Sequence, residues 1–169
     1  MTMSYCIRFL LLAATLLIAN PSSADILLGR VVGIADGDTV TVLDSSKVQF
    51  KIRLMGIDAP EKKQAFGNKS KQSLSALVFN KQVSVEYSKQ DRYGRTVGKI
   101  IVDGIDANLE QVKAGMAWHY KQYQSEQSEE DRALYAQAEV QARMEKRGLW
   151  FDAEPTPPWE WRKQQKRKD

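Results

Sequence analysis

Short β-type segments separated by turn residues restrict the fold of this chain more than any other feature. Residues 26–35 and 39–43 are rich in Leu, Val and Ile, and residues 48–55 (VQFKIRLM) alternate apolar and polar side chains. The sequences DGD at 36–38 and DSSK at 44–47, which separate these segments, are typical of tight turns. We therefore predict a three-stranded antiparallel meander in this part of the chain.

Two more strands and three helices are predicted further along. Strand patterns cover residues 83–87 and 96–102, with the turn DRYGR at 91–95 between them. Five short strands with intervening helices favour an α+β fold, a five-stranded OB-fold β-barrel with about three packed helices. Helical patterns cover residues 70–79, residues 107–113 and a stretch from the capping-box-like 128–131 to about 146, whereas PTPP at 155–158 argues against helix there.

The N-terminal residues have the pattern of an export signal. Arg8 precedes an apolar run at residues 9–19, and small residues at 22–24 resemble a cleavage site. We expect residues 1–24 to be a signal peptide and the protein to be exported, either to a periplasm or out of the cell. The run is too short to span a bilayer comfortably, so we expect no stable membrane association; an uncleaved anchor is the alternative. Cys6, the only cysteine, lies in this segment, so cleavage would leave no disulfide.

Positive charge is concentrated at the C-terminal end. The chain carries 25 Lys and Arg residues against 21 Asp and Glu, and the last ten residues hold five of the former and two of the latter. We predict a single, monomeric folded domain at residues 25–151, followed by a Pro-rich and basic tail at 152–169. We expect this tail to be a solvated end. Its Trp159 and Trp161 leave two alternatives open, contact with nucleic acid or docking on the barrel.

The residues best suited to catalysis cluster at the ends of predicted strands. Carboxylate oxygens bind hard cations such as calcium, and guanidinium groups match the geometry of phosphate oxygens. If the strands close into one barrel, the first turn and the segment after the third strand can bring their carboxylates together. Taken singly, a DGD turn, an arginine on a strand or an acidic residue beside lysines is common on protein surfaces. The candidates are Asp36, Asp38, Arg53, Asp58, Glu61 and Arg95.

The order and spacing of three segments resemble those of staphylococcal nuclease-like proteins. The segments are IADGDTV at 34–40, RLMGIDAPE at 53–61 and DRYGR at 91–95. The similarity covers roughly residues 26–151 and includes NL at 108–109, GMA at 115–117 and GLW at 148–150.

This resemblance implies a calcium-dependent nuclease with an OB-fold barrel and three helices. It implies that DNA and RNA are hydrolysed between phosphorus and the 5′ oxygen, which leaves 3′-phosphate products. Asp38, Asp58 and the backbone carbonyl of Ala59 would hold the single calcium ion, and Asp36 would support that site.

The resemblance also implies the catalytic groups. Glu61 would act as general base or orient the attacking water. Arg53 and Arg95 would bind the phosphate and offset the charge that develops in the transition state.

The sequence departs from the family pattern at a few positions. Ala59 replaces a threonine, which removes a hydroxyl group but leaves the carbonyl ligand. Tyr120 and Tyr123 have suitable character to stack on nucleotide bases, but they align with the family's tyrosine pair only after a shift. We expect Trp118, Trp150 and His119 to be structural rather than catalytic.

Two alternatives to a nuclease are open at this point. Related barrels occur as inactive nucleic-acid-binding domains, but such domains tend to lack part of the carboxylate and arginine set that this chain has. An exported protein-binding module is supported only by the long amphipathic helix, and such a helix usually packs on a core. In either nucleic-acid function we expect little sequence specificity.

Overall fold

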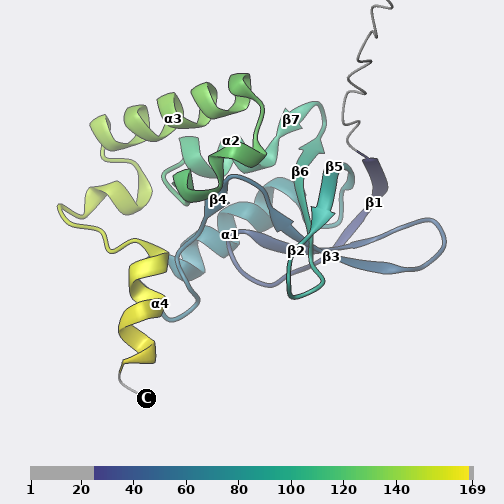
Figure 1. Ribbon diagram of the computed structural model, residues 1–169, viewed down its shortest axis with the longest axis horizontal. Coiled ribbons are helices and arrows are strands. Elements are labelled where there is room, and N and C mark those ends of the chain that lie inside the picture. Colours follow the sequence, from purple (N-terminus) through teal and green to yellow (C-terminus); the bar gives the residue numbers. More distant parts are fainter. Residues whose placement is uncertain (1–24, 168–169) are drawn as a thin grey trace, which may run out of the picture.

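The structure is a computed structural model that describes residues 25–167, so the predicted signal peptide at 1–24 lies outside the described residues. A β-barrel forms one side of the molecule, and helices pack along the other (Figure 1). None of the helices in the described part of the chain is long and apolar enough to cross a membrane.

Five strands form the barrel, as predicted. The first three make the expected antiparallel meander, and the order in the sheet is β3-β2-β1-β5-β6. The observed bounds are β1 Asp25–Ile34, β2 Thr39–Leu43, β3 Gln49–Leu54, β5 Gln82–Gln90 and β6 Thr96–Val102, so that β5 alone is clearly longer than predicted.

A parallel pairing between β3 and β6 closes the sheet. Arg53 on β3 lies opposite Val97 on β6, and Ile52 lies opposite Thr96. The turn that carries Arg95 precedes β6 directly, so closure brings this turn to the rim of the barrel near Arg53. Three two-residue strands complete the set: β4 (Ile57–Asp58) pairs with β8 (Trp118–His119), and β7 (Ile105–Asp106) pairs with β6.

The three predicted helices are all present. Their bounds are α1 Gly67–Val78, α2 Ala107–Lys113 and α3 Glu129–Met144. Ser128 caps α3 as expected, because its side chain accepts a 3.0 Å hydrogen bond from the backbone N–H of Asp131. Short 3₁₀ helices, η1 (Lys121–Glu126) and η2 (Gly148–Phe151), flank α3.

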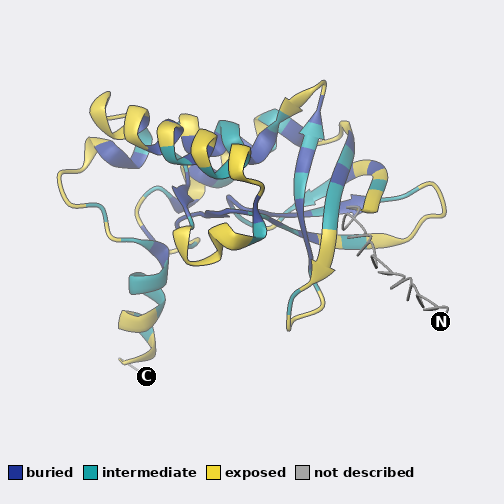
Figure 2. Ribbon diagram, turned by 45° about the horizontal axis from the view of Figure 1, so that its top comes forward, coloured by how far each residue is buried: buried dark blue, intermediate teal, exposed yellow. Residues whose placement is uncertain are grey.

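A fourth helix, α4 (Pro158–Lys166), was not predicted. The expectation of a solvated, non-helical end was wrong for these residues. Proline breaks a helix in its interior but is well tolerated in the first turn, where its missing N–H has no partner to lose. Pro158 occupies that turn, so the PTPP sequence precedes and starts a helix. Figures 1 and 2 show α4 extending from the helical side of the molecule.

The buried side chains form two clusters. The larger lies inside the barrel and beneath the helices, and it includes Val31, Ile52 and Leu74, all fully buried (Figure 2). The smaller joins Trp118 to Trp150, whose ring centroids are 4.3 Å apart, which confirms their structural role. Trp159 of α4 packs against this second cluster, so the C-terminal helix is attached to the domain by aromatic contact.

Candidate active site

An open groove of about 760 Å³ lies where the rim of the barrel meets α4. We call the side that carries Asp38, Arg53 and Asp58 the barrel wall. The side formed by α4 is called the α4 wall, and it contributes Trp159, Arg162, Lys163 and Lys166. All nine residues selected from the sequence line this groove: Asp36, Asp38, Arg53, Asp58, Ala59, Glu61, Arg95, Tyr120 and Tyr123.

The turn between β1 and β2 positions the first carboxylates. Asp36 accepts a 3.0 Å hydrogen bond from the backbone N–H of Asp38 and so lies next to that carboxylate. The Asp38 side chain accepts from the Thr39 hydroxyl at 3.0 Å and from the backbone N–H of Ala59 at 2.7 Å. Gly37 permits this turn because a Cβ there would lie 1.8 Å from the side-chain oxygen of Ser70. The first turn and the segment after β3 are thereby joined, as the barrel hypothesis predicted.

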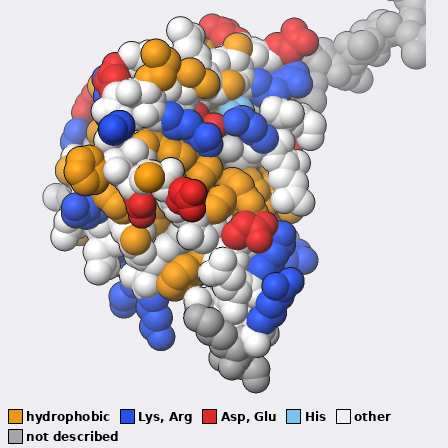
Figure 3. All heavy atoms as spheres, turned by 90° about the vertical axis from the view of Figure 1, so that its left-hand side faces the viewer, with side chains coloured by type: hydrophobic (Ala, Val, Ile, Leu, Met, Phe, Trp, Pro, Cys, Tyr) orange, Lys and Arg blue, Asp and Glu red, His pale blue; other side chains and the backbone are white. Residues whose placement is uncertain are grey.

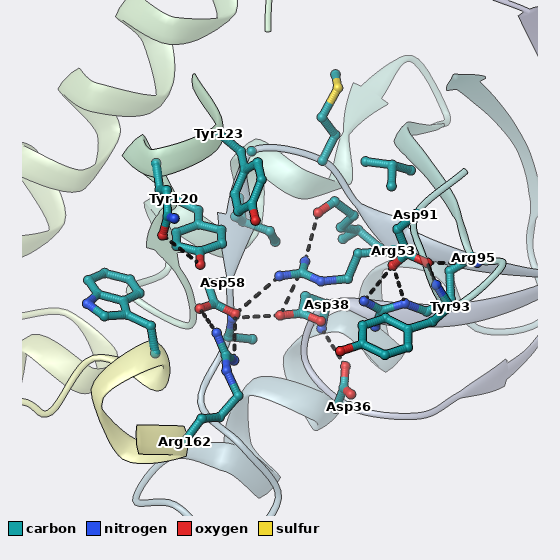
Figure 4. A pocket seen from close by; sticks show the side chains of 18 of the residues that line it. Asp36, Asp38, Arg53, Asp58, Asp91, Tyr93, Arg95, Tyr120, Tyr123 and Arg162 are labelled. Carbon is teal, nitrogen blue, oxygen red and sulfur yellow. Dashed lines mark hydrogen bonds and ion pairs between the residues drawn. The ribbon is translucent and has the colours of Figure 1, made fainter. Parts of the chain in front are cut away.

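Arg53 connects the two carboxylates (Figure 4). Its Nη1 lies 3.4 Å from Asp38 Oδ2, and its Nη2 lies 3.1 Å from Asp58 Oδ1. A further hydrogen bond from Nη1 to the Leu54 carbonyl, at 2.9 Å, holds the guanidinium against its own strand. The Arg53 side chain keeps 14% of its surface exposed, so it can still meet a ligand in the groove.

The pKa values of Asp36 and Asp58 are both raised above the usual value for an aspartate. Burial raises the pKa of Asp58, and the ion pairs with Arg162 and Arg53 offset this only in part. Burial, followed by repulsion from Asp38, raises the pKa of Asp36 to about 6. A bound cation would favour the ionised forms of both groups, so this cluster of negative charge suits a cation-binding site.

The donor set fits a hard cation held by few side chains. Among residues 25–167, no group of three or more Asp, Glu, His or Cys side chains is arranged to hold a metal ion. The carboxylates of Asp38 and Asp58 lie near each other because Arg53 forms ion pairs with both. The Ala59 N–H, next to Asp58 in the chain, also donates to Asp38. Calcium and magnesium commonly complete such a partial set with backbone carbonyls and waters, which is the place expected for the carbonyl of Ala59.

Arg95 is held separately, within its own turn. Its Nε and Nη2 lie 2.8 Å and 2.7 Å from Asp91 Oδ2, and its backbone N–H donates to Asp91 Oδ1 at 3.0 Å. Burial would raise the pKa of Asp91, but the hydrogen bonds from Arg95 and Tyr93 outweigh it and hold the pKa below its usual value. Arg95 therefore lines the groove but contacts Asp91, not the Asp38–Asp58 pair with which it was expected to converge (Figure 4).

The two tyrosines lie together, but their surroundings differ from the expectation. The rings of Tyr120 and Tyr123 are 5.0 Å apart and tilted by 59°. Tyr120 also stacks on Trp159, with centroids 5.4 Å apart and an angle of 14° between the planes. One face of Tyr120 is therefore covered by protein, whereas Tyr123 remains 45% exposed and available to a base.

Arg162 lines the groove beside Asp58 and Glu61, although it is not among the residues predicted from the sequence. Arg162 donates from Nη2 to Asp58 Oδ2 at 2.7 Å and from Nη1 to Glu61 Oε1 at 2.8 Å and to Asp58 Oδ1 at 3.2 Å. The available signal was the combination of tryptophans and basic residues after Pro158, which on a helix puts Trp159 and Arg162 on one face. Because no helix was predicted there, the sequence provided no reason to place Trp159 and Arg162 on one face.

His119 is structural, as expected. Its side chain is 2% exposed, packs edge-on against Tyr135 at 5.8 Å and meets Gln127 Oε1 at 3.0 Å through Nε2. Burial lowers the pKa of His119. The neutral imidazole therefore supports β8, which leads directly to Tyr120.

Comparison with known proteins agrees with this geometry. Residues 51–152 match the family described as "Staphylococcal nuclease homologue". An "Uncharacterized endonuclease" of Escherichia coli is 47% identical over 135 residues, 79% of this chain and 84% of the relative. An "Uncharacterized endonuclease" of Haemophilus influenzae is 47% identical over 137 residues, 81% of this chain and 74% of the relative. A "Micrococcal nuclease" of Shigella flexneri is 37% identical over 169 residues, 95% of this chain and 94% of the relative.

The family match and the endonuclease and nuclease relatives, together with the paired carboxylates and arginines at the rim of the barrel, identify the class of this protein as a phosphodiester hydrolase. The chain belongs to the staphylococcal nuclease family and is a nuclease. The alternative of a non-catalytic binding module is thereby set aside.

Proposed function

We propose that this protein is an exported, calcium-dependent nuclease that hydrolyses phosphodiester bonds of DNA and RNA with little sequence specificity. The observation that carries this proposal is the Arg53 guanidinium, which meets both Asp38 and Asp58 in an open groove. A phosphate group entering the groove would meet a guanidinium and a cation-binding pair at the same point.

Asp38, Asp58 and the Ala59 carbonyl would hold the calcium ion, and Asp36 would keep Asp38 in place through the hydrogen bond to its N–H. When bound, the ion supplies polarisation of a phosphoryl oxygen and a position for the attacking water. Calcium sites with few carboxylates commonly complete the coordination of the ion with backbone carbonyls and water molecules.

Glu61 would accept the proton of the attacking water or orient that water. Its side chain is 39% exposed on the groove, so water reaches it. The new bond forms between the water oxygen and phosphorus, and the bond from phosphorus to the 5′ oxygen breaks. The 5′ oxygen takes a proton from solvent water in the open groove, so the products are a 3′-phosphate and a 5′-hydroxyl. Arg53 and Arg95 would offset the charge that develops on the phosphoryl oxygens.

The groove also supports the proposed breadth of substrate. The chemical groups on its rim are suited to phosphates and to stacking on exposed Tyr123, and neither contact distinguishes one base from another. We further propose that residues 1–24 direct export and that the enzyme works as a monomer.

The test is an assay of the purified protein with single-stranded DNA and with RNA, first with calcium and then with a chelator. Degradation that depends on calcium and is lost in Asp38→Asn is the expected result. Asp103→Asn is the matched control, because Asp103 is an exposed turn carboxylate with 71% of its side chain accessible. Calcium-independent cleavage, or full activity of Asp38→Asn, would contradict the metal assignment.

A further inference from the structure

The α4 wall is more than a covering of the barrel, because its exposed face is basic and points into the groove. Trp159, Arg162, Lys163 and Lys166 all line the groove, and their spacing along the chain puts them on one side of a helix. Figure 3 shows Lys and Arg side chains toward the lower end of this face of the molecule, where α4 ends.

Aromatic contacts fix the N-terminal end of α4. The Trp159 ring stacks on Tyr120 and meets Trp118 edge-on, with centroids 5.5 Å apart. Just before the helix, the Thr156 carbonyl accepts a 2.6 Å hydrogen bond from the side chain of Gln64. Contacts on both sides of Pro158 thus hold the start of the helix against the domain.

Arg162 lies one turn further along and changes the charge balance of the groove. Apart from α4, the described residues that line the groove include six Asp and Glu side chains but only four Lys and Arg side chains, and this excess of negative charge would repel a polyanion. Arg162 approaches Asp58 from a different side than Arg53 does (Figure 4). Its side chain remains 40% exposed, so part of its five-donor guanidinium is available to a ligand.

We propose that α4 is the second wall of the substrate groove, in which Arg162 binds a backbone phosphate of single-stranded nucleic acid and Trp159 positions the helix and Tyr120. The inference rests on the proposed function, whose substrate class it narrows. A single strand is specified because the exposed ring of Tyr123, which lines the same groove, can stack only on a base that is unpaired. Lys163 and Lys166 extend the same positive surface along the strand.

Binding without cleavage tests the role of Arg162. A fluorescein-labelled single-stranded oligonucleotide of about 12 nucleotides is titrated with the protein in chelator, and anisotropy is followed from ~50 to ~200 mM salt. Arg162→Ala is expected to bind about tenfold more weakly. The slope of log affinity against log salt should decrease by about 0.7, the value for one phosphate contact on a single strand.

A matched variant separates a specific contact from loss of charge. Arg167→Ala removes the same charge from the same segment, but Arg167 is outside the set of described residues that line the groove. It is expected to bind like the unchanged protein. An equal loss of oligonucleotide affinity in Arg162→Ala and Arg167→Ala would show that the C-terminal residues attract nucleic acid only through their overall charge, and this would overturn the proposal.

A second pair of variants tests the positioning role of Trp159. Trp159→Ala should weaken oligonucleotide binding at least as much as Arg162→Ala, because the helix loses its stacking contact, and Trp159→Phe should restore most of it. Trp161→Ala is the control on the same helix, since Trp161 is also outside the described lining of the groove. Unchanged binding in Trp159→Ala would contradict the role.

The remaining outcomes distinguish this proposal from the proposed function. Tighter binding by Arg162→Ala would show that α4 blocks the groove, and equal loss for a duplex of the same sequence would contradict the single-strand assignment. Because binding is measured in chelator, it does not depend on catalysis. A protein that binds through Arg162 but never cleaves would keep this inference and overturn the nuclease proposal; a protein that cleaves with unchanged binding in Arg162→Ala would do the reverse.

Discussion

The two walls of the groove are held by different means. On the barrel wall, Asp58 is 1% exposed and Asp38 is 6% exposed, and both are fixed by strand pairing or backbone hydrogen bonds. On the α4 wall, the Arg162 side chain is 40% exposed, and Pro158 is the one buried residue among the described residues of the helix. The barrel wall is thus pre-organised by the fold, which electrostatic catalysis requires, whereas the α4 wall depends on a few side-chain contacts.

This difference divides the work between the walls. Groups that act on the reacting phosphate need positions accurate to a fraction of an ångström, and these come from the barrel. Groups that bind the rest of the strand tolerate more movement, and the helix supplies them. Changes on the barrel wall should therefore affect turnover, and changes on the α4 wall should affect substrate affinity.

The largest effect is expected from Arg53→Ala. Loss of the guanidinium removes stabilisation of the transition state and leaves Asp38 and Asp58 facing each other, so kcat should fall about 10³-fold. Steady-state kinetics on a single-stranded DNA substrate measures this. Arg30→Ala is the control, because Arg30 is an exposed arginine on β1 that meets Asn80. A loss below about tenfold would contradict the division of work.

A smaller effect on kcat is expected when Arg95 loses its ion-pair partner, Asp91. In Asp91→Asn the side-chain oxygen can still accept the backbone hydrogen bonds of the turn, but the ion pair with Arg95 is lost. We expect kcat to fall about tenfold, as for loss of a group that orients a functional side chain. Asp103→Asn, in another exposed turn, should have no effect. Unchanged kcat in Asp91→Asn would show that Arg95 needs no such partner.

Removal of the α4 wall should leave the barrel intact. A protein that ends at Ala153 loses the stacking of Trp159 on Tyr120 and Trp118, so Tm should fall by about 5 °C while the far-ultraviolet circular dichroism of the barrel persists. KM should rise more than kcat falls. A truncated protein that does not fold would show that α4 belongs to the core.

The smallest effect concerns His119, a buried residue on β8. Burial lowers its pKa in the folded state, so the unfolded chain binds a proton first as pH falls through about 6.5. Stability supplied by the neutral ring is therefore present above that pH and lost below it. His119→Gln should make Tm less dependent on pH between about 7 and 5, by a few degrees. An identical pH dependence in both proteins would contradict the burial argument.

Much of the barrel wall was predictable because its determinants are local. Alternation of side chains defines a strand within a few residues, and a DGD sequence defines a turn, so the ends of β1, β2 and β3 followed from short segments. The resemblance to the nuclease family then supplied the roles proposed for Asp38, Asp58 and Arg53. The convergence of the carboxylates required one further assumption, that the strands close into a barrel, and the β3–β6 pairing confirms it.

The sequence by itself therefore determined the five strands of the barrel, the meander of the first three, the helices up to α3 and the candidate residues at the rim. Only the tertiary structure decided that Arg162 meets Asp58, 104 positions away along the chain, and that Trp159 covers one face of Tyr120. Periodicity and turn preferences describe neighbours in the chain, whereas contact between distant side chains depends on how whole elements pack. Because the proline-rich segment begins a helix, Arg162, Lys163 and Lys166 line the groove together with the carboxylates of the barrel.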